Sequence, residues 1–194
     1  MQDTSASLLD RLRDDPDEAS WRELVSLYTP LIRGWLRRYA ARADDADDVV
    51  QEVLAVLTRK LPDFRKEPRP GAFRRWLRAI TVNCLRAHWR RQRAHPPGTG
   101  DSDVARALTE LENPDSGLSR LWDEEHDRHV TAALLELIQP RFADTTWQAF
   151  RRVALDGIPP TDVASELGLT VNAVFIAKSR VMTALRQEGR GLLD

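Results

Sequence analysis

Apolar residues recur every three or four positions along most of this chain, and this helical period constrains the fold more than any other feature of the sequence. The stripes consist of Trp21, Leu24, Tyr28, Leu31, Trp35 and Tyr39, then Val49, Val50, Val53, Leu54 and Leu57, and then Phe73, Trp76, Leu77, Ile80, Cys84 and His88. No alternating strand pattern reaches a convincing length. We therefore predict an all-α fold in which the first three helices pack into one compact domain.

Proline, glycine and acidic residues divide the chain into parts. Residues 61–71 (LPDFRKEPRPG) predict a loop, and residues 95–100 (HPPGTG) end the third helix. The acidic stretch that continues to about Ser116 holds few large apolar residues, so we expect it to stay unordered. The predicted organisation is a pair of small helical domains, residues 1–94 and 118–194, joined by a flexible acidic linker at residues 95–117.

The net charge of −1 conceals two blocks of opposite charge. Between Arg59 and Arg93 there are twelve basic and two acidic residues, whereas between Thr99 and His129 there are three basic and nine acidic residues. A segregated basic block is the electrostatic signature of a protein that binds a polyanion. A solvated helix face is the alternative, but the aromatic residues within the block favour nucleic acid.

Residues 159–187 have the pattern of a helix-turn-helix. A short helix is followed by Gly168, which turns the chain, and by Thr170, which is suited to cap a longer helix. At about 100° per residue, the apolar residues of the longer helix gather on one buried face, formed by Val174, Ala177, Val181 and Leu185. The residues expected to contact a DNA groove lie outside that face: Asn172, Phe175, Ile176, Ser179 and Arg180. An ordinary helical hairpin is the alternative.

The sequence also argues against several classes of protein. No apolar run approaches the ~20 residues that span a bilayer, and the first ten residues lack a signal-peptide pattern. The lone Cys84 excludes an internal disulfide and a cysteine-based zinc site. The acidic cluster near residue 48 has no histidine or cysteine beside it. We therefore expect a cytoplasmic protein with no membrane segment, catalytic site, metal or cofactor.

Three blocks of the sequence resemble the extracytoplasmic-function sigma factors of the sigma-70 family. ADDVVQEV (residues 46–53) resembles region 2.2, FRRWLRAITVN (73–83) resembles regions 2.3 and 2.4, and residues 155–186 resemble region 4. The resemblance implies docking on the β′ clamp helices and the β flap of core RNA polymerase, and reading of the −10 and −35 promoter elements. The chain departs from the family at Ala87, where aspartate is usual, and at Phe175 and the two residues after it, where Lys-Ser-Arg is frequent.

The resemblance also implies roles for particular residues. Those implied to bind the polymerase are Asp47, Asp48, Gln51 and Glu52, and those implied to contact −10 phosphates are Arg74, Arg75, Arg78, Arg86 and Arg90. Phe64 would stack on an unstacked base and Asn83 would bond its edge. The alternatives are loop packing for Phe64, core packing for Trp76 and a solvated first turn for the acidic cluster.

These observations leave more than one function open. A sigma factor is the first interpretation, with promoter DNA and core RNA polymerase as partners and an anti-sigma factor in trans as the regulator that the resemblance suggests. The alternative is a helix-turn-helix transcriptional regulator that acts without being a polymerase subunit. That alternative predicts a sensor pocket and a dimerisation element, and the sequence shows neither. A nucleic-acid enzyme predicts clustered polar chemistry, which is also not seen.

Overall fold

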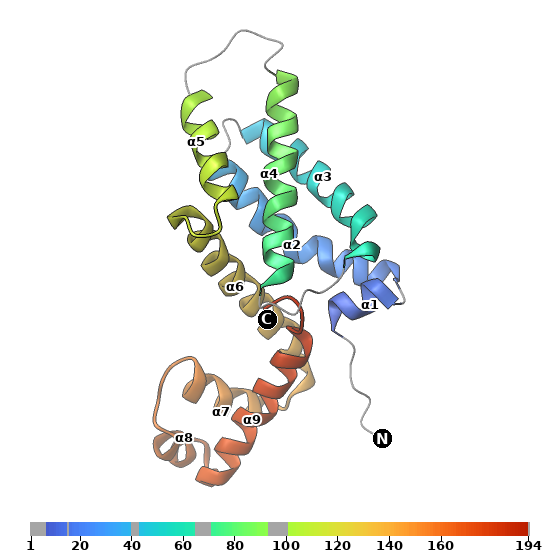
Figure 1. Cartoon of the computed structure of the whole chain (residues 1–194). Coiled ribbons are helices and arrows are strands. Elements are labelled where there is room, and N and C mark those ends of the chain that lie inside the picture. The colour runs from blue at the N-terminus through green and yellow to red at the C-terminus, as the bar shows by residue number, and fades with distance from the viewer. Residues whose placement is uncertain (1–6, 15, 40–42, 65–70, 93–100, 194) are drawn as a thin grey trace. The chain divides into compact units, whose positions relative to one another are not determined.

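The computed structural model describes residues 7–14, 16–39, 43–64, 71–92 and 101–193, and no strand occurs among them (Figure 1). The described residues form the helices α1 (Leu8–Asp14), α2 (Glu18–Tyr39), α3 (Ala43–Lys60), η1 (Leu61–Asp63), α4 (Ala72–Gln92), α5 (Asp101–Glu112), α6 (Gly117–Ile138), η2 (Gln139–Arg141), α7 (Asp144–Ala154), α8 (Pro160–Leu167) and α9 (Val171–Glu188). The predicted all-α fold is confirmed. Within these ranges, no helix has both the length and the apolarity needed to cross a membrane.

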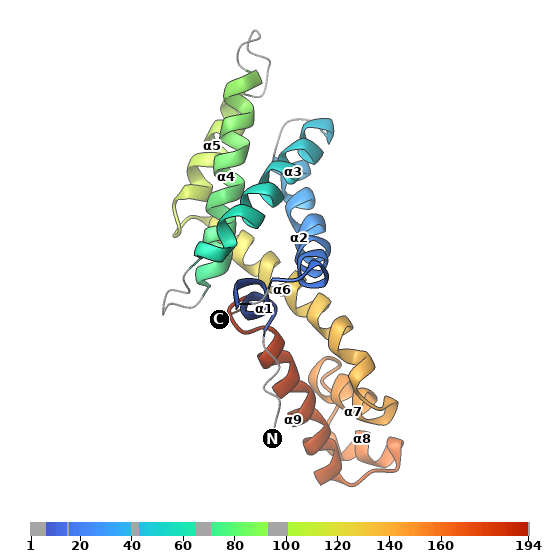
Figure 2. The same ribbon diagram turned by 90° about the vertical axis from the view of Figure 1, so that its right-hand side faces the viewer.

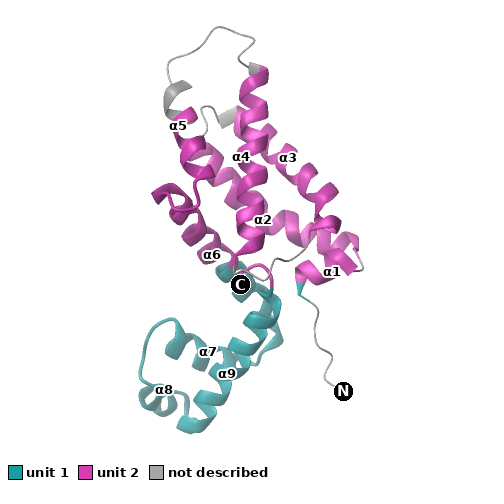
Figure 3. Cartoon of the chain, viewed as in Figure 1, with its two compact units in different colours: residues 1–7, 131–190 teal, residues 8–130, 191–194 magenta. Residues whose placement is uncertain are grey.

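The chain divides into two compact units, which Figure 3 shows in different colours. The N-terminal unit comprises residues 8–130 and 191–194, and therefore contains α1 to α5 and the first part of α6. The C-terminal unit comprises residues 131–190, with residues 1–7, and contains the end of α6 and α7 to α9. The boundary between the units thus lies within α6, at residues 130 and 131.

The apolar stripes that define the predicted helices form the core of the N-terminal unit. α3 contacts both α2 and α4, and α1 contacts α2 and η1. The stripe residues that are buried are Leu24, Tyr28, Leu31, Trp35, Val49, Val50, Val53, Leu57, Phe73, Leu77, Ile80 and Cys84. Helix α1 was not predicted from the sequence, although it buries Leu8, Leu9 and Leu12. Its seven residues are too few for a periodic pattern to be conspicuous.

The acidic stretch forms a helix, although its composition predicts a flexible linker. Residues 101–112 form α5, which lies alongside α4 in both views (Figure 1 and Figure 2). Leu108 and Leu111, one helical turn apart, are buried. The stretch is polar on average, so its composition does not reveal these two leucines. They are buried because α5 packs against α4. Residues 95–100 of the expected linker lie outside the described residues.

The first part of α6 also lies in the N-terminal unit rather than in a second domain that begins at residue 118. Trp122, His126 and Val130, spaced four apart, are buried there. The hydroxyl of Ser116 accepts a hydrogen bond from the backbone N–H of Ser119 at 3.0 Å, which satisfies one donor at the start of the helix. The structural boundary therefore lies about a dozen residues beyond the predicted one.

The C-terminal unit contains the predicted helix-turn-helix. α8 ends at Leu167, the next residue, Gly168, has a φ of 63° in the left-handed region, and α9 begins after Thr170. The Thr170 hydroxyl accepts a hydrogen bond from the N–H of Ala173 at 3.1 Å. Helices α7, α8 and α9 enclose an apolar cluster of Ala149, Val163, Ala164, Val174 and Ala177, and a neighbouring cluster consists of Ile138, Phe150 and Val181.

The turn at Gly168 gives a testable prediction. A Cβ at this position would meet no atom within 4 Å, so the penalty for alanine is conformational alone. We expect Gly168→Ala to destabilise the C-terminal unit by about 1–2 kcal/mol. Gly34, within α2, also has open space around it. Gly34→Ala should therefore stabilise the N-terminal unit by about 1 kcal/mol. Calorimetry of the full chain measures both changes, and a Gly168→Ala protein as stable as wild type would contradict the left-handed turn.

Candidate polymerase and nucleic-acid interfaces

The α3 residues that the resemblance assigns to polymerase binding divide into two that are exposed and two that form ion pairs within the unit. Asp48 and Gln51 are exposed. Asp47 instead accepts a hydrogen bond from the Arg33 guanidinium of α2 at 2.7 Å. Glu52 forms an ion pair with Arg91 of α4. Of the residues implied to bind the polymerase, two are therefore exposed, and two bind other helices of the same unit.

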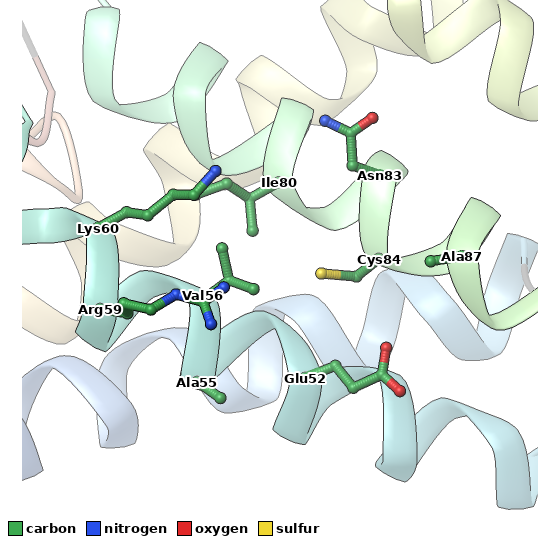
Figure 4. A pocket seen from close by; sticks show the side chains of 9 residues that line it. All are labelled: Glu52, Ala55, Val56, Arg59, Lys60, Ile80, Asn83, Cys84 and Ala87. Carbon is green, nitrogen blue, oxygen red and sulfur yellow. The ribbon is translucent and has the colours of Figure 1, made fainter.

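A groove of about 390 Å³ lies between α3 and α4. Figure 4 shows its lining, which consists of Glu52, Ala55, Val56, Arg59 and Lys60 from α3, and Ile80, Asn83, Cys84 and Ala87 from α4. Arg59, Lys60 and Asn83 are exposed, whereas Ile80 is buried. The groove thus combines two cations, an amide and an apolar floor. Cations attract phosphate, and an amide is able to bond a base edge.

The thiol of Cys84, which lines this groove, is not activated as a nucleophile. The Cys84 sulfur points into the groove (Figure 4). Burial is the largest influence on this thiol and raises its pKa above the usual value. The thiol is therefore neutral at physiological pH, and a neutral thiol is a poor nucleophile and metal ligand.

Phe64 belongs to an aromatic cluster at the end of η1. Its ring lies 4.7 Å from that of Trp76, centroid to centroid, and 5.6 Å from that of Phe73, which it meets edge-on. Phe64 therefore packs against α4, and its ring is still half-exposed. Trp76 is also half-buried rather than fully enclosed. Residues 65–70 lie outside the described residues, and they include three of the basic residues of the basic block.

Arg78 of α4 does not point outward to a nucleic acid. The residue is 5% exposed, and its guanidinium donates hydrogen bonds to the Ser119 carbonyl at 3.2 Å and the Asp123 carboxylate at 3.0 Å. Burial lowers the pKa of Arg78, and the nearby Asp123 carboxylate opposes this effect. The expected phosphate contact does not fit this arrangement, because Arg78 is buried and its Nη1 group is bound to Asp123 and Ser119.

Two more arginines of α4 are held by acidic residues. Arg74 forms ion pairs with Asp127 and, at 3.6 Å, with Asp123. Arg86 forms an ion pair with Glu112 of α5. Arg75 is half-buried and Arg90 is exposed, so the side chain of Arg90 is the more accessible to a phosphate.

A buried hydrogen-bond network extends this set of contacts. The His126 ring lies 3.0 Å from an Asp127 oxygen and 3.3 Å from the Tyr28 hydroxyl. Burial raises the pKa of Tyr28 well above its usual value, so this phenol stays neutral. Partial burial acts to raise the pKa of Asp127, but hydrogen bonds from His126 and Arg74 prevail and lower it. Asp127 is therefore a carboxylate at neutral pH.

The predicted groove-reading residues lie together on the outer side of α9. Asn172, Ser179 and Arg180 are exposed, and Phe175 and Ile176 are 52% and 51% exposed. On the opposite side, Val174, Ala177 and Val181 are buried. The predicted buried face of this helix is confirmed at these three residues, and Leu185, its fourth predicted member, is half-buried. The helix-turn-helix therefore presents two large apolar side chains between polar ones.

Two functional candidates emerge from the structure and were not predicted from the sequence. Arg59 and Lys60 line the groove beside Asn83, and their place at the end of α3, one residue before the proline-rich loop, was the available signal. Among the residues whose placement is described, no group of three or more His, Cys, Asp or Glu side chains is arranged to hold a metal ion.

Comparisons with known proteins agree with this geometry. The Sigma-70 region 2 family matches residues 24–95, which include α2, α3 and α4. The ECF RNA polymerase sigma-E factor of Haemophilus influenzae is 28% identical over 185 residues, which cover 93% of this chain and 91% of the relative. The RNA polymerase sigma-H factor of Pseudomonas aeruginosa is 26% identical over 195 residues, which cover 95% of each chain. A third relative, the ECF RNA polymerase sigma factor SigE of Mycolicibacterium smegmatis, is 24% identical over 187 residues, or 95% of this chain and 66% of its own length.

The family match falls on the helices that form the α3–α4 groove, and the relatives align with nearly the whole chain. The chain is therefore similar to extracytoplasmic-function sigma factors along nearly its whole length, and α2 to α4 match region 2 of the sigma-70 family.

Proposed function

We propose that this protein is a sigma factor that binds core RNA polymerase and directs it to promoters, with the N-terminal unit acting at the −10 element and the C-terminal unit at the −35 element. The observation that carries the proposal is the Sigma-70 region 2 match over residues 24–95, the segment that builds the cationic α3–α4 groove. The chain itself needs no catalytic residue, metal or cofactor for this function, because the polymerase performs the chemistry. We place the protein in the cytoplasm, where polymerase and chromosome are found.

Polymerase docking is assigned to the exposed side of α3. Asp48 and Gln51 are available there, whereas Asp47 and Glu52 are paired with arginines of α2 and α4. An exposed carboxylate beside an amide suits a basic surface, and the resemblance suggests the β′ clamp helices. The β flap is the partner that the resemblance suggests for the C-terminal unit. An anti-sigma factor acting in trans is the proposed regulator.

Strand opening is assigned to the α3–α4 groove and the Phe64 cluster. Arg59 and Lys60 supply charge for the phosphates of a separated strand. Asn83 lies at the exposed side of the groove, where its amide can bond the edge of an unpaired base. The half-exposed ring of Phe64 supplies a stacking surface.

Recognition of duplex DNA is assigned to the outer side of α9. A helix of this kind reads base edges in the major groove. Asn172 is able to bond an adenine edge, and Phe175 and Ile176 suit thymine methyl groups. Arg180 suits a phosphate. The departure from the family's Lys-Ser-Arg run therefore predicts a promoter preference that depends more on apolar contacts.

The docking assignment predicts a specific loss of polymerase binding. Asp48→Lys combined with Gln51→Ala should weaken binding to core RNA polymerase by about tenfold or more, because an attractive rim contact becomes repulsive. Glu18→Lys is the matched control, since Glu18 is exposed on α2 outside this surface. Binding is measured by competition for labelled core polymerase, with circular dichroism to verify folding. Normal binding by the double variant would show that α3 is not the docking surface. If the wild-type chain does not bind core polymerase at all, the proposed function is wrong.

The two DNA sites should fail at different steps of initiation. Asn83→Ala and Phe64→Ala should reduce promoter opening and leave −35 duplex binding intact, since one lost base stack costs about 1–3 kcal/mol. Asn172→Ala and Arg180→Ala should weaken duplex recognition and spare transcription from a pre-melted −10 bubble. Thr183→Ala, on the same helix, is the control for α9.

Permanganate footprinting on duplex and pre-melted templates separates these steps. Because Phe64 packs on Trp76, its loss could also disturb folding, whereas the Asn83 amide is exposed and serves as the cleaner variant. The division of labour is contradicted if Asn83→Ala opens the duplex like wild type, or if the bubble does not rescue Asn172→Ala.

A further inference from the structure

The basic helix α4 and the acidic first part of α6 carry opposite charges at the same four-residue spacing. Arg74 and Arg78 are four residues apart on α4, and Asp123 and Asp127 are four residues apart on α6. Residues at this spacing lie on one face of a helix. Asp123 binds both arginines, at 3.0 Å from Arg78 and 3.6 Å from Arg74, and Asp127 binds Arg74.

Two further ion pairs connect the acidic segment to the same unit. Glu112 of α5 binds Arg86 of α4, and Glu125 of α6 binds Arg38 of α2 at 2.6 Å. We name the four carboxylates Glu112, Asp123, Glu125 and Asp127 the acidic clamp. They belong to the block of net negative charge, and three of them bind the block of net positive charge.

Apolar and hydrogen-bonded contacts hold the clamp in place. The ring of Trp122 lies 4.9 Å from that of Trp35. His129 lies 2.7 Å from the Leu27 carbonyl oxygen, and His126 contacts Tyr28. Specific contacts, and not electrostatic attraction alone, therefore hold the first part of α6 against α2 and α4.

A guanidinium whose donors are held by carboxylates cannot bind phosphate with the same donors. Carboxylate and phosphate present similar acceptors to arginine, so the two compete for one site. The carboxylates are part of the same chain and therefore compete at a high effective concentration. DNA in solution must displace them before it can bind Arg74 or Arg78.

We propose that the acidic clamp is an intramolecular competitor of DNA, which keeps the basic face of α4 closed in the free protein. In the promoter complex, the phosphates of the nucleic acid replace the clamp carboxylates, and the first part of α6 leaves α4. The free protein is thus prevented from occupying DNA without polymerase. This inference rests on the proposed function for the use of α4 at promoters, although its test on the free protein does not.

A permanent structural brace is the alternative, and it makes a different prediction. If α6 never leaves α4, neutralising its carboxylates lowers stability and leaves DNA affinity unchanged. If the clamp competes with DNA, neutralisation uncovers two cations and raises affinity. Asn differs little from Asp in size, so the substitutions change charge with the smallest change in packing.

The test uses the full-length free protein and fluorescein-labelled oligonucleotides, single-stranded and duplex, of mixed sequence. Binding is measured by anisotropy at several salt concentrations. Asp123→Asn with Asp127→Asn should bind DNA at least about tenfold more tightly than wild type, and the salt dependence should steepen by about two units of slope, since each added phosphate contact contributes about 0.9. The matched control is Asp115→Asn with Glu124→Gln, which removes the same charge from exposed positions.

Two further variants keep the result interpretable. Asp127→Asn alone leaves the Arg78–Asp123 pair intact and should give about half the change in slope, or one phosphate contact. Arg74→Met with Arg78→Met, added to the neutralised protein, should abolish the gain. Equal affinity of the neutralised and wild-type proteins, or an equal gain in the matched control, would overturn the clamp. If such a failure accompanies normal transcription by the wild-type holoenzyme, only this inference is lost and the proposed function stands.

Discussion

The buried guanidinium of Arg78 is the group on which the arrangement of the N-terminal unit depends. A charge removed from water is tolerated only when it is paired and hydrogen-bonded, and here the Nη1 group of Arg78 donates to Asp123 and to the Ser119 carbonyl. Both partners lie on α6, so this requirement fixes α6 along α4. Trp35, Leu111 and Trp122 line the small apolar cavity beside Arg78. Residues from α2, α4, α5 and α6 therefore meet around one charged group.

Much of the fold could be predicted because its signals are local. Helical stripes identify α2, α3 and α4, and the pattern around Gly168 identifies the helix-turn-helix with the correct buried face of α9. Local signals fail where a segment gains its order from distant residues. Helix α5 has few apolar residues of its own, and Leu108 and Leu111 stabilise it only because α4 provides the surface against which they are buried. The domain boundary is misplaced for the same reason, because Trp122 and His126 pack on α2.

The candidate sites can also be divided into those that local signals predict and those that depend on distant residues. The outer face of α9 follows from helical geometry alone, and all of its predicted residues are exposed. The basic face of α4 is predicted from residue type and from the family resemblance, and neither reveals whether an arginine faces solvent or an aspartate 45 residues away. The signal was nevertheless present, because two arginines and two aspartates share the same four-residue spacing. A basic block followed by an acidic block predicts a partner within the chain as well as one outside it.

The central claim is that the first part of α6 lies against α4 in the free protein and leaves it in the promoter complex. A distance between spin labels tests this most directly, with Ala79→Cys on α4 and Glu124→Cys on α6 in a Cys84→Ala background. Ala79 and Glu124 are exposed, so the labels should not disturb the core. Pulsed electron resonance should give one short distance for the free protein and a clearly longer one for the holoenzyme on promoter DNA. The same short distance in both states would contradict the account.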